Sequence, residues 1–394
     1  MTQSRTRWCF LFMLVLMLPI LAGEVVHSLD HTIITRVASN LYNPRGVAVL
    51  ADGRLVVVEA GLGTDQPGEA QGSGRISIFA DTNGDGDYDD ANERTPILEQ
   101  QPSYNSLYTF RTGHDEVFGL SDVVIVDNER IFYTKDDPFA ESGHAGEEGF
   151  HGDTGIYEIQ EGWTEEVLLL ERIATLNAIV YDPDRAAFFV TESGFNQTMR
   201  ATLTAEAEVV AKMPTLAHNQ QPVPSGIALD PTTGDLLVTL FSGFVHDYFD
   251  TQLSFMPGDA RVVRVNPDTG EVTDEIVGLT TAIDVAVDEA GNIFVVEMTT
   301  GWPPTPMPFA FDVYDPTLPP DPGGYAHFSG RVTMYPVDKA EPVVLADGLD
   351  TPTNITYANG TLYVSVGQGT PGRSVLSPDG VKRIEGALYI ITGF

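Results

Sequence analysis

A motif of two short apolar runs joined by a turn recurs six times along this chain. Each run is rich in β-branched and aromatic residues, and the turn contains Gly, Asn, Asp or Pro. This pattern is typical of a β-hairpin. Because the hairpin repeats, a repeat architecture is predicted. The copies are residues 43–61, 120–137, 176–194, 223–243, 282–300 and 352–369.

A third predicted strand, and usually a fourth, follows each hairpin. The intervals between equivalent positions of the six hairpins are 76, 56, 48, 58 and 70 residues. A four-stranded blade with loops of variable length fits these intervals, so we predict an all-β, six-bladed β-propeller over residues 29–394. The equivalent positions are Gly46, Asp122, Ala178, Gly226, Asp284 and Asn354.

The two ends of the chain each supply part of a blade. Residues 386–394 form a third strand without a fourth, and residues 31–40 form a fourth strand without a blade of their own. If the N-terminal strand pairs with the C-terminal one, the ring closes and the exposed edges disappear. Two consecutive β-sandwiches are the alternative, and they leave both end strands unexplained.

The N-terminus resembles a signal peptide. Arg5 and Arg7 precede an apolar run of 15 residues from Trp8 to Ala22. That length is short for a membrane span of roughly 20 residues and fits a signal-peptide core. We therefore predict a signal peptide over residues 1–28, with cleavage after residue 22, 23 or 28; a retained N-terminal anchor is the alternative. Cys9, the one cysteine, lies inside this segment, so the mature protein has no disulfide.

The chain is strongly acidic. It has 21 Lys and Arg against 56 Asp and Glu, a net charge of −35. This charge repels nucleic acid and anionic membranes and attracts cations. Nucleic-acid binding and stable membrane insertion of the mature chain are therefore not expected. Solubility, or adaptation to salt, is the other explanation of the charge.

The loops of this propeller are unequal. Turns between the first and second strands are short, whereas most loops between the second and third strands are long. In a propeller these two kinds of connection lie on opposite faces, so the long loops share one face, and elaborated loops on a rigid scaffold often bind ligands. The alternative is that these loops are long because nothing constrains their length. The long loops are residues 60–74, 136–153, 242–259, 299–329 and 367–385.

Residues 81–93, DTNGDGDYDDANE, match the first half of an EF-hand calcium loop. Ca²⁺ prefers six to eight oxygen ligands, and closely spaced carboxylates otherwise repel one another. We predict a structural Ca²⁺ site on the face away from the long loops; a solvated acidic turn is the alternative. The twelfth position is Asn92, with Glu93 beside it, so the bidentate ligand is displaced. The predicted ligands are Asp81, Asn83, Asp85, Asp87 and Asp89.

A second group of polar residues comes from aligning the six hairpins. Charged residues end the second strands at Glu59, Lys135, Glu192 and Glu297, and polar residues begin the first strands. All are predicted to converge at the channel mouth on the long-loop face, where crowded carboxylates raise one another's pKa. The alternative is that they satisfy backbone donors or line a water-filled channel. The first-strand residues are Asp122, Asn177, Asp284 and Asn354.

Several segments resemble the ScyD/ScyE family. They are VASNLYNPRGVAVLADGRLVVVEAG (37–61), VPSGIALDPTTGDLLVTLFSGF (223–244), PGDARVVRV (257–265) and LADGLDTPTNITYANGTLYVS (345–365). The resemblance implies an exported propeller of the NHL-repeat type and implies no established reaction.

Together these features predict a secreted or periplasmic, calcium-stabilised propeller, monomeric, that binds a small-molecule, glycan or protein ligand without catalysis. No G-x-S-x-G, P-loop or dinucleotide fingerprint is present. The competing hypothesis is an enzyme at the channel mouth, either a metal-dependent lactonase or esterase or a sugar-oxidising enzyme. In the hydrolase version, Asp122, Asn177, Asp284 and Asn354 hold the cation. Glu59, Glu192 or Glu297 then serves as base.

Overall fold

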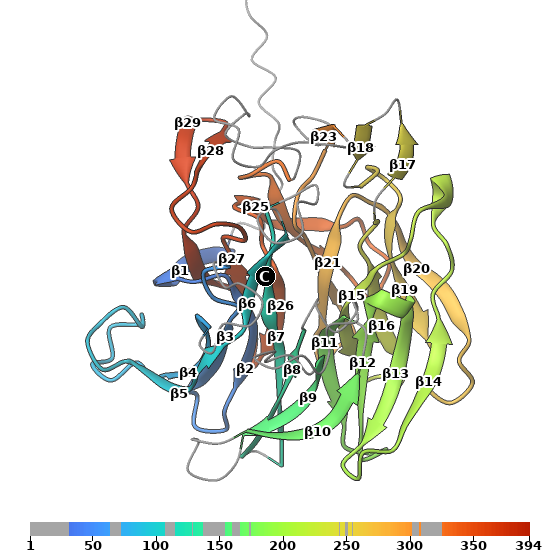
Figure 1. Cartoon of the computed structure of the whole chain (residues 1–394), viewed down its shortest axis with the longest axis horizontal. Coiled ribbons are helices and arrows are strands. Elements are labelled where there is room, and N and C mark those ends of the chain that lie inside the picture. The colour runs from blue at the N-terminus through green and yellow to red at the C-terminus, as the bar shows by residue number, and fades with distance from the viewer. Residues whose placement is uncertain are drawn as a thin grey trace, which may run out of the picture.

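The six predicted hairpins are the inner strands of six sheets arranged around one axis (Figure 1). The computed structural model describes residues 31–63, 72–106, 115–127, 129–136, 154–159, 166–172, 175–243, 245–248, 251–253, 255–301, 307–308 and 325–394. The predicted signal peptide lies outside these residues. The innermost strands contact one another in chain order, and the last contacts the first. The six-bladed β-propeller is therefore confirmed.

In blades 1 to 3 the strands lie in chain order from the axis outwards. Blade 2 has an additional short strand, β6 (Ser103–Asn105), beside its first strand. Blade 1 contains β2 (Pro44–Val49), β3 (Leu55–Glu59), β4 (Gly74–Phe79) and β5 (Arg94–Gln101). Blade 2 contains β7 (Val117–Val126), β8 (Arg130–Lys135), β9 (Thr154–Ile159) and β10 (Glu166–Arg172). Blade 3 contains β11 (Leu176–Asp182), β12 (Ala187–Glu192), β13 (Gln197–Thr202) and β14 (Ala207–Lys212).

Blades 4 to 6 have the same order, except that the outer strand of blade 6 comes from the N-terminus. Blade 4 contains β15 (Pro224–Leu229), β16 (Leu236–Leu240), β19 (Ala260–Val265) and β20 (Val272–Leu279). Blade 5 contains β21 (Ala282–Val287), β22 (Ile293–Glu297), β24 (Gly330–Tyr335) and β25 (Val343–Leu349). Blade 6 contains β26 (Asn354–Ala358), β27 (Thr361–Val366), β30 (Gly386–Thr392) and β1 (Ile33–Leu41).

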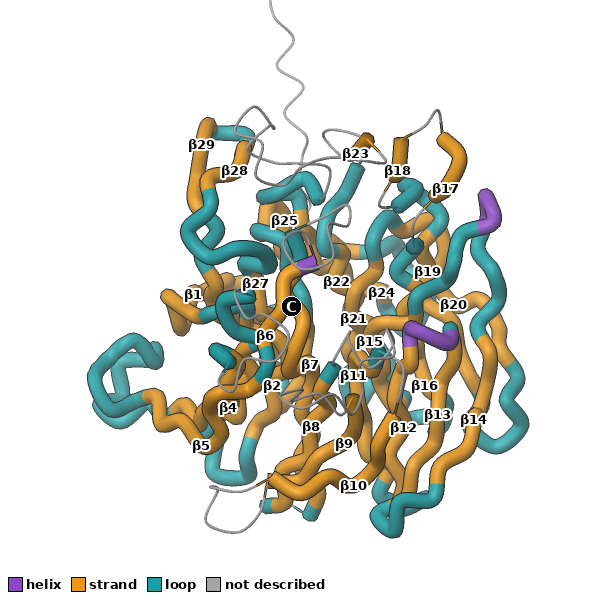
Figure 2. Tube along the Cα trace, viewed as in Figure 1, coloured by secondary structure: helices purple, strands orange, loops and turns teal. Residues whose placement is uncertain are grey.

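The described parts of the long loops form additional strands on one face. β17 (Val245–Tyr248), β18 (Thr251–Leu253) and β23 (Met307–Pro308) form a small sheet, and β28 (Ser374–Ser377) and β29 (Gly380–Arg383) form a hairpin. Figure 1 places all five along the same edge of the molecule, opposite the short turns. In the described residues, the helical segments are two short 3₁₀ turns, η2 (Ser193–Phe195) and η3 (Ala217–Asn219), and one further helical residue, Ser106 (Figure 2). None of these described segments is a helix long and apolar enough to cross a membrane.

The hydrophobic core is divided among the six interfaces between neighbouring blades. Each interface has its own cluster of buried aliphatic and aromatic side chains. Because each sheet is covered on both faces, inner strands such as β3, LVVVE, are buried at every position and read as continuous apolar runs. Each fully buried Val, Leu, Ile or Phe contributes about 1.5–3 kcal/mol, so the interfaces provide much of the stability.

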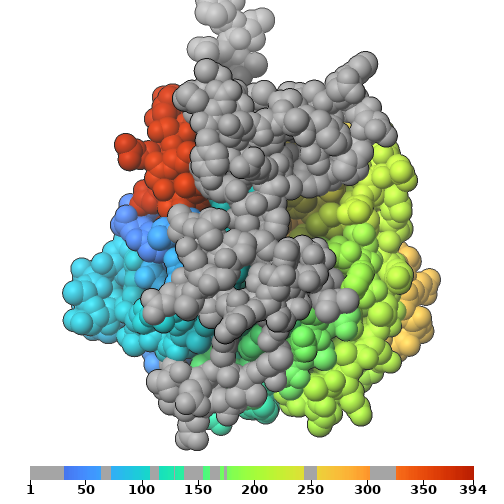
Figure 3. All heavy atoms as spheres, in the orientation of Figure 1, coloured from blue at the N-terminus to red at the C-terminus, as the bar shows by residue number. Residues whose placement is uncertain are grey.

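The ring closes between the two ends of the chain, as predicted. β1 pairs antiparallel with β30, with Ile34 opposite Ile391. Val37, Ala38 and Leu41 are buried in the cluster between blades 6 and 1. Figure 3 shows the blue residues of β1 between the red C-terminal residues and the cyan 81–93 region.

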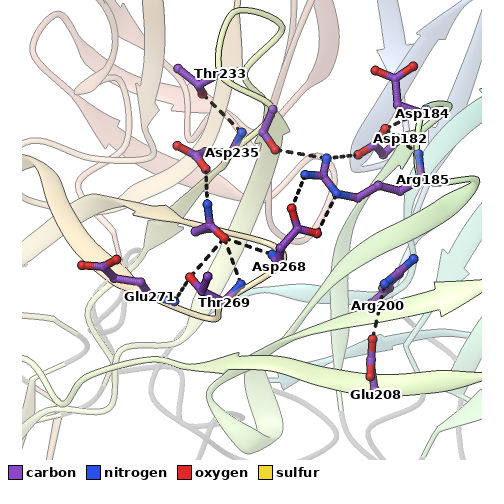
Figure 4. A network of polar contacts seen from close by, with 12 residues as sticks. Asp182, Asp184, Arg185, Arg200, Glu208, Thr233, Asp235, Asp268, Thr269 and Glu271 are labelled. Carbon is purple, nitrogen blue, oxygen red and sulfur yellow. Dashed lines mark hydrogen bonds and ion pairs between the residues drawn. The ribbon is translucent and has the colours of Figure 1, made fainter.

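Ion pairs also connect neighbouring blades on the face with the short turns. Arg185, in the turn between β11 and β12, donates to Asp182 Oδ2 at 2.6 Å. It also forms a bidentate pair with Asp268 of the blade 4 turn, at 3.1 and 2.7 Å (Figure 4). Bidentate geometry strengthens this tie, although the exposure of Asp268 limits its contribution.

The ring closure predicts a difference between two substitutions on β1. Leu41→Ala removes a side chain that is 1% exposed, and we expect the free energy of unfolding to fall by about 2–5 kcal/mol. Ile33→Ala, where the side chain is 61% exposed, is the control and should change it by about 0.5 kcal/mol or less. Urea unfolding measures both, and equal effects would contradict the closure.

Candidate functional site at the channel mouth

A break in strand pairing recurs where the first strand of a blade enters the channel. In five of the six blades the register between the first and second strands shifts at this point. Such an irregularity turns side chains out of the regular alternation of a strand. The shifted segments lie within Pro44–Val47, Leu120–Val123, Leu176–Ile179, Pro224–Ile227 and Ala282–Asp284.

In blades 2, 3 and 4, a hydroxyl on the second strand accepts a hydrogen bond from a first-strand amide at this break. Thr191 Oγ1 accepts from the amide of Ala178 at 2.9 Å and donates to the carbonyl of Ser225, in the next blade, at 2.8 Å. Thr134 and Thr239 occupy the equivalent positions in blades 2 and 4 and make the same two kinds of bond. These hydroxyls therefore hold the first strands of neighbouring blades in a fixed relation.

A cavity of about 270 Å³ lies above these segments, and a second of about 340 Å³ continues down the channel between aliphatic side chains. Asp122, Asp284 and Asn354 line both cavities, so they form the polar boundary between them. Asn177 lines the upper cavity and donates to Pro224 O at 3.2 Å. The structure thus brings together the four predicted residues of the first strands.

The two aspartates are held in the same way on opposite sides of the ring, in blades 2 and 5. Asp122 accepts from the amides of Val123 and Ile179, both at 2.9 Å. Asp284 accepts from the amides of Val285 and Ile355, both at 2.9 Å. The side chain of Asn354 donates to Asp284 Oδ2 at 2.8 Å. Each carboxylate therefore joins its own blade to the following one.

A glycine in the preceding blade makes room for each carboxylate. A Cβ at Gly46 would lie 2.4 Å from Asp122 Oδ1, and one at Gly226 would lie 2.2 Å from Asp284 Oδ1. Both distances are far inside van der Waals contact, so only glycine fits. Sequence reasoning did not assign these glycines to the site. Their positions in the sequence could have indicated this role. When the six hairpins are aligned, Gly46 occupies the position of Asp122 in the preceding blade, and Gly226 that of Asp284.

Burial raises the pKa of both aspartates, and repulsion by Asp122 adds to the rise at Asp284. Burial raises the pKa of Asp122 to about 6, against the hydrogen bonds from Ile179 and Val123 that lower it. Burial raises the pKa of Asp284 well above its usual value, and the charge of Asp122 raises it further. The two groups therefore titrate as a pair.

The wall of the upper cavity combines a charged pair with aromatic rings, and sequence reasoning did not predict these residues. Arg45 donates to Val117 O at 2.6 Å and lies 3.7 Å from Glu116. Tyr325 packs edge-on against Phe241, with ring centroids 5.9 Å apart. Burial raises the pKa of Tyr325 well above its usual value. Both Arg45 and Tyr325 come from segments that meet only when the ring closes.

Four other predicted residues do not line the cavity. Glu59 binds the amide of Tyr42 at 2.7 Å and pairs with Arg75, and Glu192 pairs with Arg172. Glu297 accepts from the amide of Thr280 at 2.7 Å. Lys135 Nζ lies over the ring of Tyr157, 4.0 Å from its centroid. The expected convergence of these side chains at the mouth is not observed, because second-strand side chains at this level enter the blade interfaces.

The acidic loop 81–93 docks on the strand that closes the ring. The amide of Tyr88 donates to Val37 O at 2.7 Å, and Asp89 binds the amide and hydroxyl of Ser39 at 2.8 and 2.9 Å. Asp89 also pairs with Arg94. The carboxylate of Asp89, one of the predicted calcium ligands, is therefore already bound to Ser39 and Arg94.

The side chains of the other predicted calcium ligands form hydrogen bonds within the loop itself. Asp81 accepts from the amides of Gly84 and Gly86 at 2.6 and 3.0 Å. Asn83 and Asp85 exchange hydrogen bonds at 2.9 Å, and Asp87 accepts from the amide of Asp89. Over the described ranges, no group of three or more His, Cys, Asp and Glu side chains is arranged to hold a metal ion.

No protein-family model and no curated protein matches this chain, whereas solved structures do. A gluconolactonase from Xanthomonas campestris is 12% identical and has a TM-score of 0.50, with 92% of this chain and 89% of that chain covered. A protein of unknown function from Bacteroides thetaiotaomicron VPI-5482 has the same identity and TM-score, with 92% and 76% covered. A virginiamycin B lyase from Staphylococcus aureus is 12% identical, has a TM-score of 0.47, and is covered over its full length.

At this identity the similarity shows the fold alone, that of a β-propeller. The narrower resemblance to the ScyD/ScyE family remains a prediction.

The raised pKa of Asp122 predicts a pH dependence of stability. Its pKa is about 6 in the folded chain and 3.8 in a model compound. Its contribution to stability is therefore complete below about pH 3.8 and is lost as the pH rises through about 6. A shift of about two units corresponds to about 3 kcal/mol.

The measurement compares the wild type with Asp122→Asn by urea unfolding between pH 4 and 7. Asp122→Asn removes a carboxylate oxygen that accepts from a backbone amide, and this lowers the free energy of unfolding equally at every pH. Only the pH-dependent part of the difference between the two proteins therefore reports the pKa of Asp122. We expect wild-type stability to fall relative to the variant by up to about 3 kcal/mol. Asp184→Asn, in an exposed turn, is the control and should show no such trend. Parallel curves for the wild type and Asp122→Asn would refute the raised pKa.

Proposed function

We propose that the protein binds a small molecule in the cavity at the channel mouth, and that this binding is its function. The observation that carries the proposal is the pair Asp122 and Asp284 at the floor of a cavity of about 270 Å³, where Asp284 is buried and Asp122 is half-buried. Binding sites are typically concave and largely apolar, with a few convergent polar groups whose pKa values are shifted. Asn177 and Asn354 add amide donors and acceptors at the same level.

The cavity wall supports binding without catalysis as the leading function. Arg45 is engaged with Glu116 and with a backbone carbonyl. Tyr325 packs in a buried cluster with Phe241, Phe255 and Met298. These groups shape the cavity and exclude water, while the polar floor supplies orientation. We also propose that the protein is exported, on the evidence of its apolar N-terminal run.

Cation-assisted hydrolysis of a lactone or ester is the second candidate function. The pKa of Asp122, about 6, suits a group that exchanges protons near neutral pH. A divalent cation at the floor would polarise a substrate carbonyl. The gluconolactonase among the structural neighbours shares only the fold, so it adds no support for this activity.

A cavity-blocking variant tests the binding function. Gly194 lines the upper cavity and is exposed, so Gly194→Trp should obstruct the mouth without disturbing the floor. Protonated amines, neutral sugars and lactones are screened at millimolar concentration by thermal shift. We expect at least one class to raise the melting temperature of the wild type and not that of Gly194→Trp.

Phe195→Trp, at the neighbouring exposed residue that does not line the cavity, is the matched control. The binding function fails if no class binds, or if Gly194→Trp binds as well as the wild type. Turnover of a lactone that depends on added divalent cation would replace binding by the hydrolase.

We further propose that Ca²⁺ binds the loop 81–93 and stabilises the closed ring. The order of Asp81, Asn83 and Asp85 supports this, as does the crowding of carboxylates, which raises the pKa of Asp90 chiefly through Asp85. The loop contacts β1 through Tyr88 and Asp89. Ordering of the loop by calcium would therefore reinforce the ring closure.

Calcium at 100 times its Kd should stabilise the fold by about 2.7 kcal/mol. Calorimetric melting with calcium and with chelator measures this effect in the wild type. The variant Asp81→Asn/Asp85→Asn should lose it, whereas the exposed Asp379→Asn in the β28–β29 hairpin should keep it. An identical melting temperature with calcium and chelator, together with no calcium in elemental analysis, would exclude the site.

A further inference from the structure

The floor of the upper cavity carries negative charge that no described cationic side chain neutralises. Among the described residues, Asp122 and Asp284 accept hydrogen bonds from backbone amides and from Asn354 alone. Within the described part of the chain, neither forms an ion pair with Lys, Arg or His. Asp284 is buried and Asp122 half-buried, and a carboxylate removed from water without a cationic partner is costly unless it is protonated or meets a positive ligand.

The cation on the cavity wall does not compensate this charge. Arg45 is the one Lys or Arg among the described residues that line the upper cavity. Its guanidinium is directed to Val117 O and towards Glu116. Arg45 and Glu116 therefore offset each other, and the charge of the aspartate pair remains. Among the described residues, the other titratable groups that line this cavity are Arg45, Glu116 and Tyr325.

A single positive charge fits this floor better than a divalent metal ion. The charge of Asp122 opposes ionisation of Asp284, so the pair favours one net negative charge over two. A calcium or magnesium ion needs six or more oxygens in its shell. The described residues around the cavity provide no group of three acidic or histidine side chains placed for a metal.

The walls above the floor suit an apolar or aromatic body. Phe118, Val223, Phe241, Ile283 and Tyr325 line the cavity beside the polar groups. Tyr325 stacks on Phe255 at 6.0 Å, which fixes the orientation of its ring. Aromatic faces attract organic cations as well as apolar groups. The cavity therefore has an anionic end and an apolar side.

We propose that this cavity binds an organic monocation, with a protonated amine between Asp122 and Asp284 and an apolar body against Phe241 and Tyr325. This inference rests on the proposed binding function and names its ligand class. The ammonium group donates hydrogen bonds to carboxylate oxygens that already accept backbone amides. The net charge of −35 favours the approach of such a ligand.

The probe is 2-phenylethylammonium, and 2-phenylethanol is its neutral counterpart of nearly the same shape. Isothermal titration of the wild-type protein is performed at pH 5 and pH 8. We expect the ammonium to bind about tenfold more tightly at pH 8, because the ionised fraction of Asp122 rises from about one tenth to nearly complete. The alcohol should bind at least about tenfold more weakly than the ammonium at pH 8.

Two variants test whether the aspartate pair is responsible. Asp122→Asn should weaken ammonium binding at pH 8 by at least about tenfold. Asp184→Asn makes the same charge change in an exposed turn on the face with the short turns and should bind like the wild type. If Asp122→Asn does not fold, the comparison of ammonium with alcohol and the pH profile still test the proposal on the wild-type protein.

The proposal fails if the alcohol binds as tightly as the ammonium, if binding is independent of pH, or if folded Asp122→Asn retains it. Competition by calcium chloride at equal concentration would instead indicate a metal site. If sugars bind and amines do not, the organic-cation proposal falls while the binding function stands. If Gly194→Trp binds every probe like the wild type, both fall.

Discussion

The closure of the ring is the constraint on which the structure depends. A blade has two apolar faces and cannot bury either alone, so each needs a neighbour on both sides. The pairing of β1 with β30 gives the sixth blade its outer strand and places Val37, Ala38 and Leu41 against the first blade. The chain has one cysteine and so no internal disulfide, and this closure has to be held by packing and hydrogen bonds. The acidic loop adds contacts at the same place, through Tyr88 and Asp89.

The site at the channel mouth depends, in addition to ring closure, on the register shift between the first and second strands of a blade. Where the first strand enters the channel, the register shift frees an amide and reorients the neighbouring side chains. Thr134, Thr191 and Thr239 accept from such amides and donate to the next blade. The irregularity that exposes Asp122 is thus stabilised by a bond between blades. The glycines at 46 and 226 complete the arrangement by leaving space for the two carboxylates.

The two acidic regions of this chain differ in their electrostatics. Most of the loop 81–93 is exposed, and its carboxylates are solvated or paired with Arg94, except for that of the buried Glu93. At the channel floor, Asp284 is buried and Asp122 is half-buried, and no cationic side chain of the described residues pairs with either, so their pKa values rise. The two aspartates of the floor therefore attract a positive ligand more strongly than the many carboxylates of the loop, because burial removes the screening that water supplies. For this reason we place the organic cation in the cavity.

The pattern of apolar runs and turns in the sequence determined the six blades, the closure of the ring and the polar starts of the first strands, because local periodicity and strand count limit how such a chain can bury its core. Four of the predicted channel-mouth residues, among them Asp122 and Asp284, do meet. The tertiary structure alone decided that Glu59, Glu192 and Glu297 do not line the cavity. Their carboxylates instead bind backbone amides or arginine side chains. The tertiary structure also decided that Arg45 and Tyr325 form the wall. Both outcomes depend on strand register and on contacts between distant segments, which side-chain type and spacing along the chain do not encode.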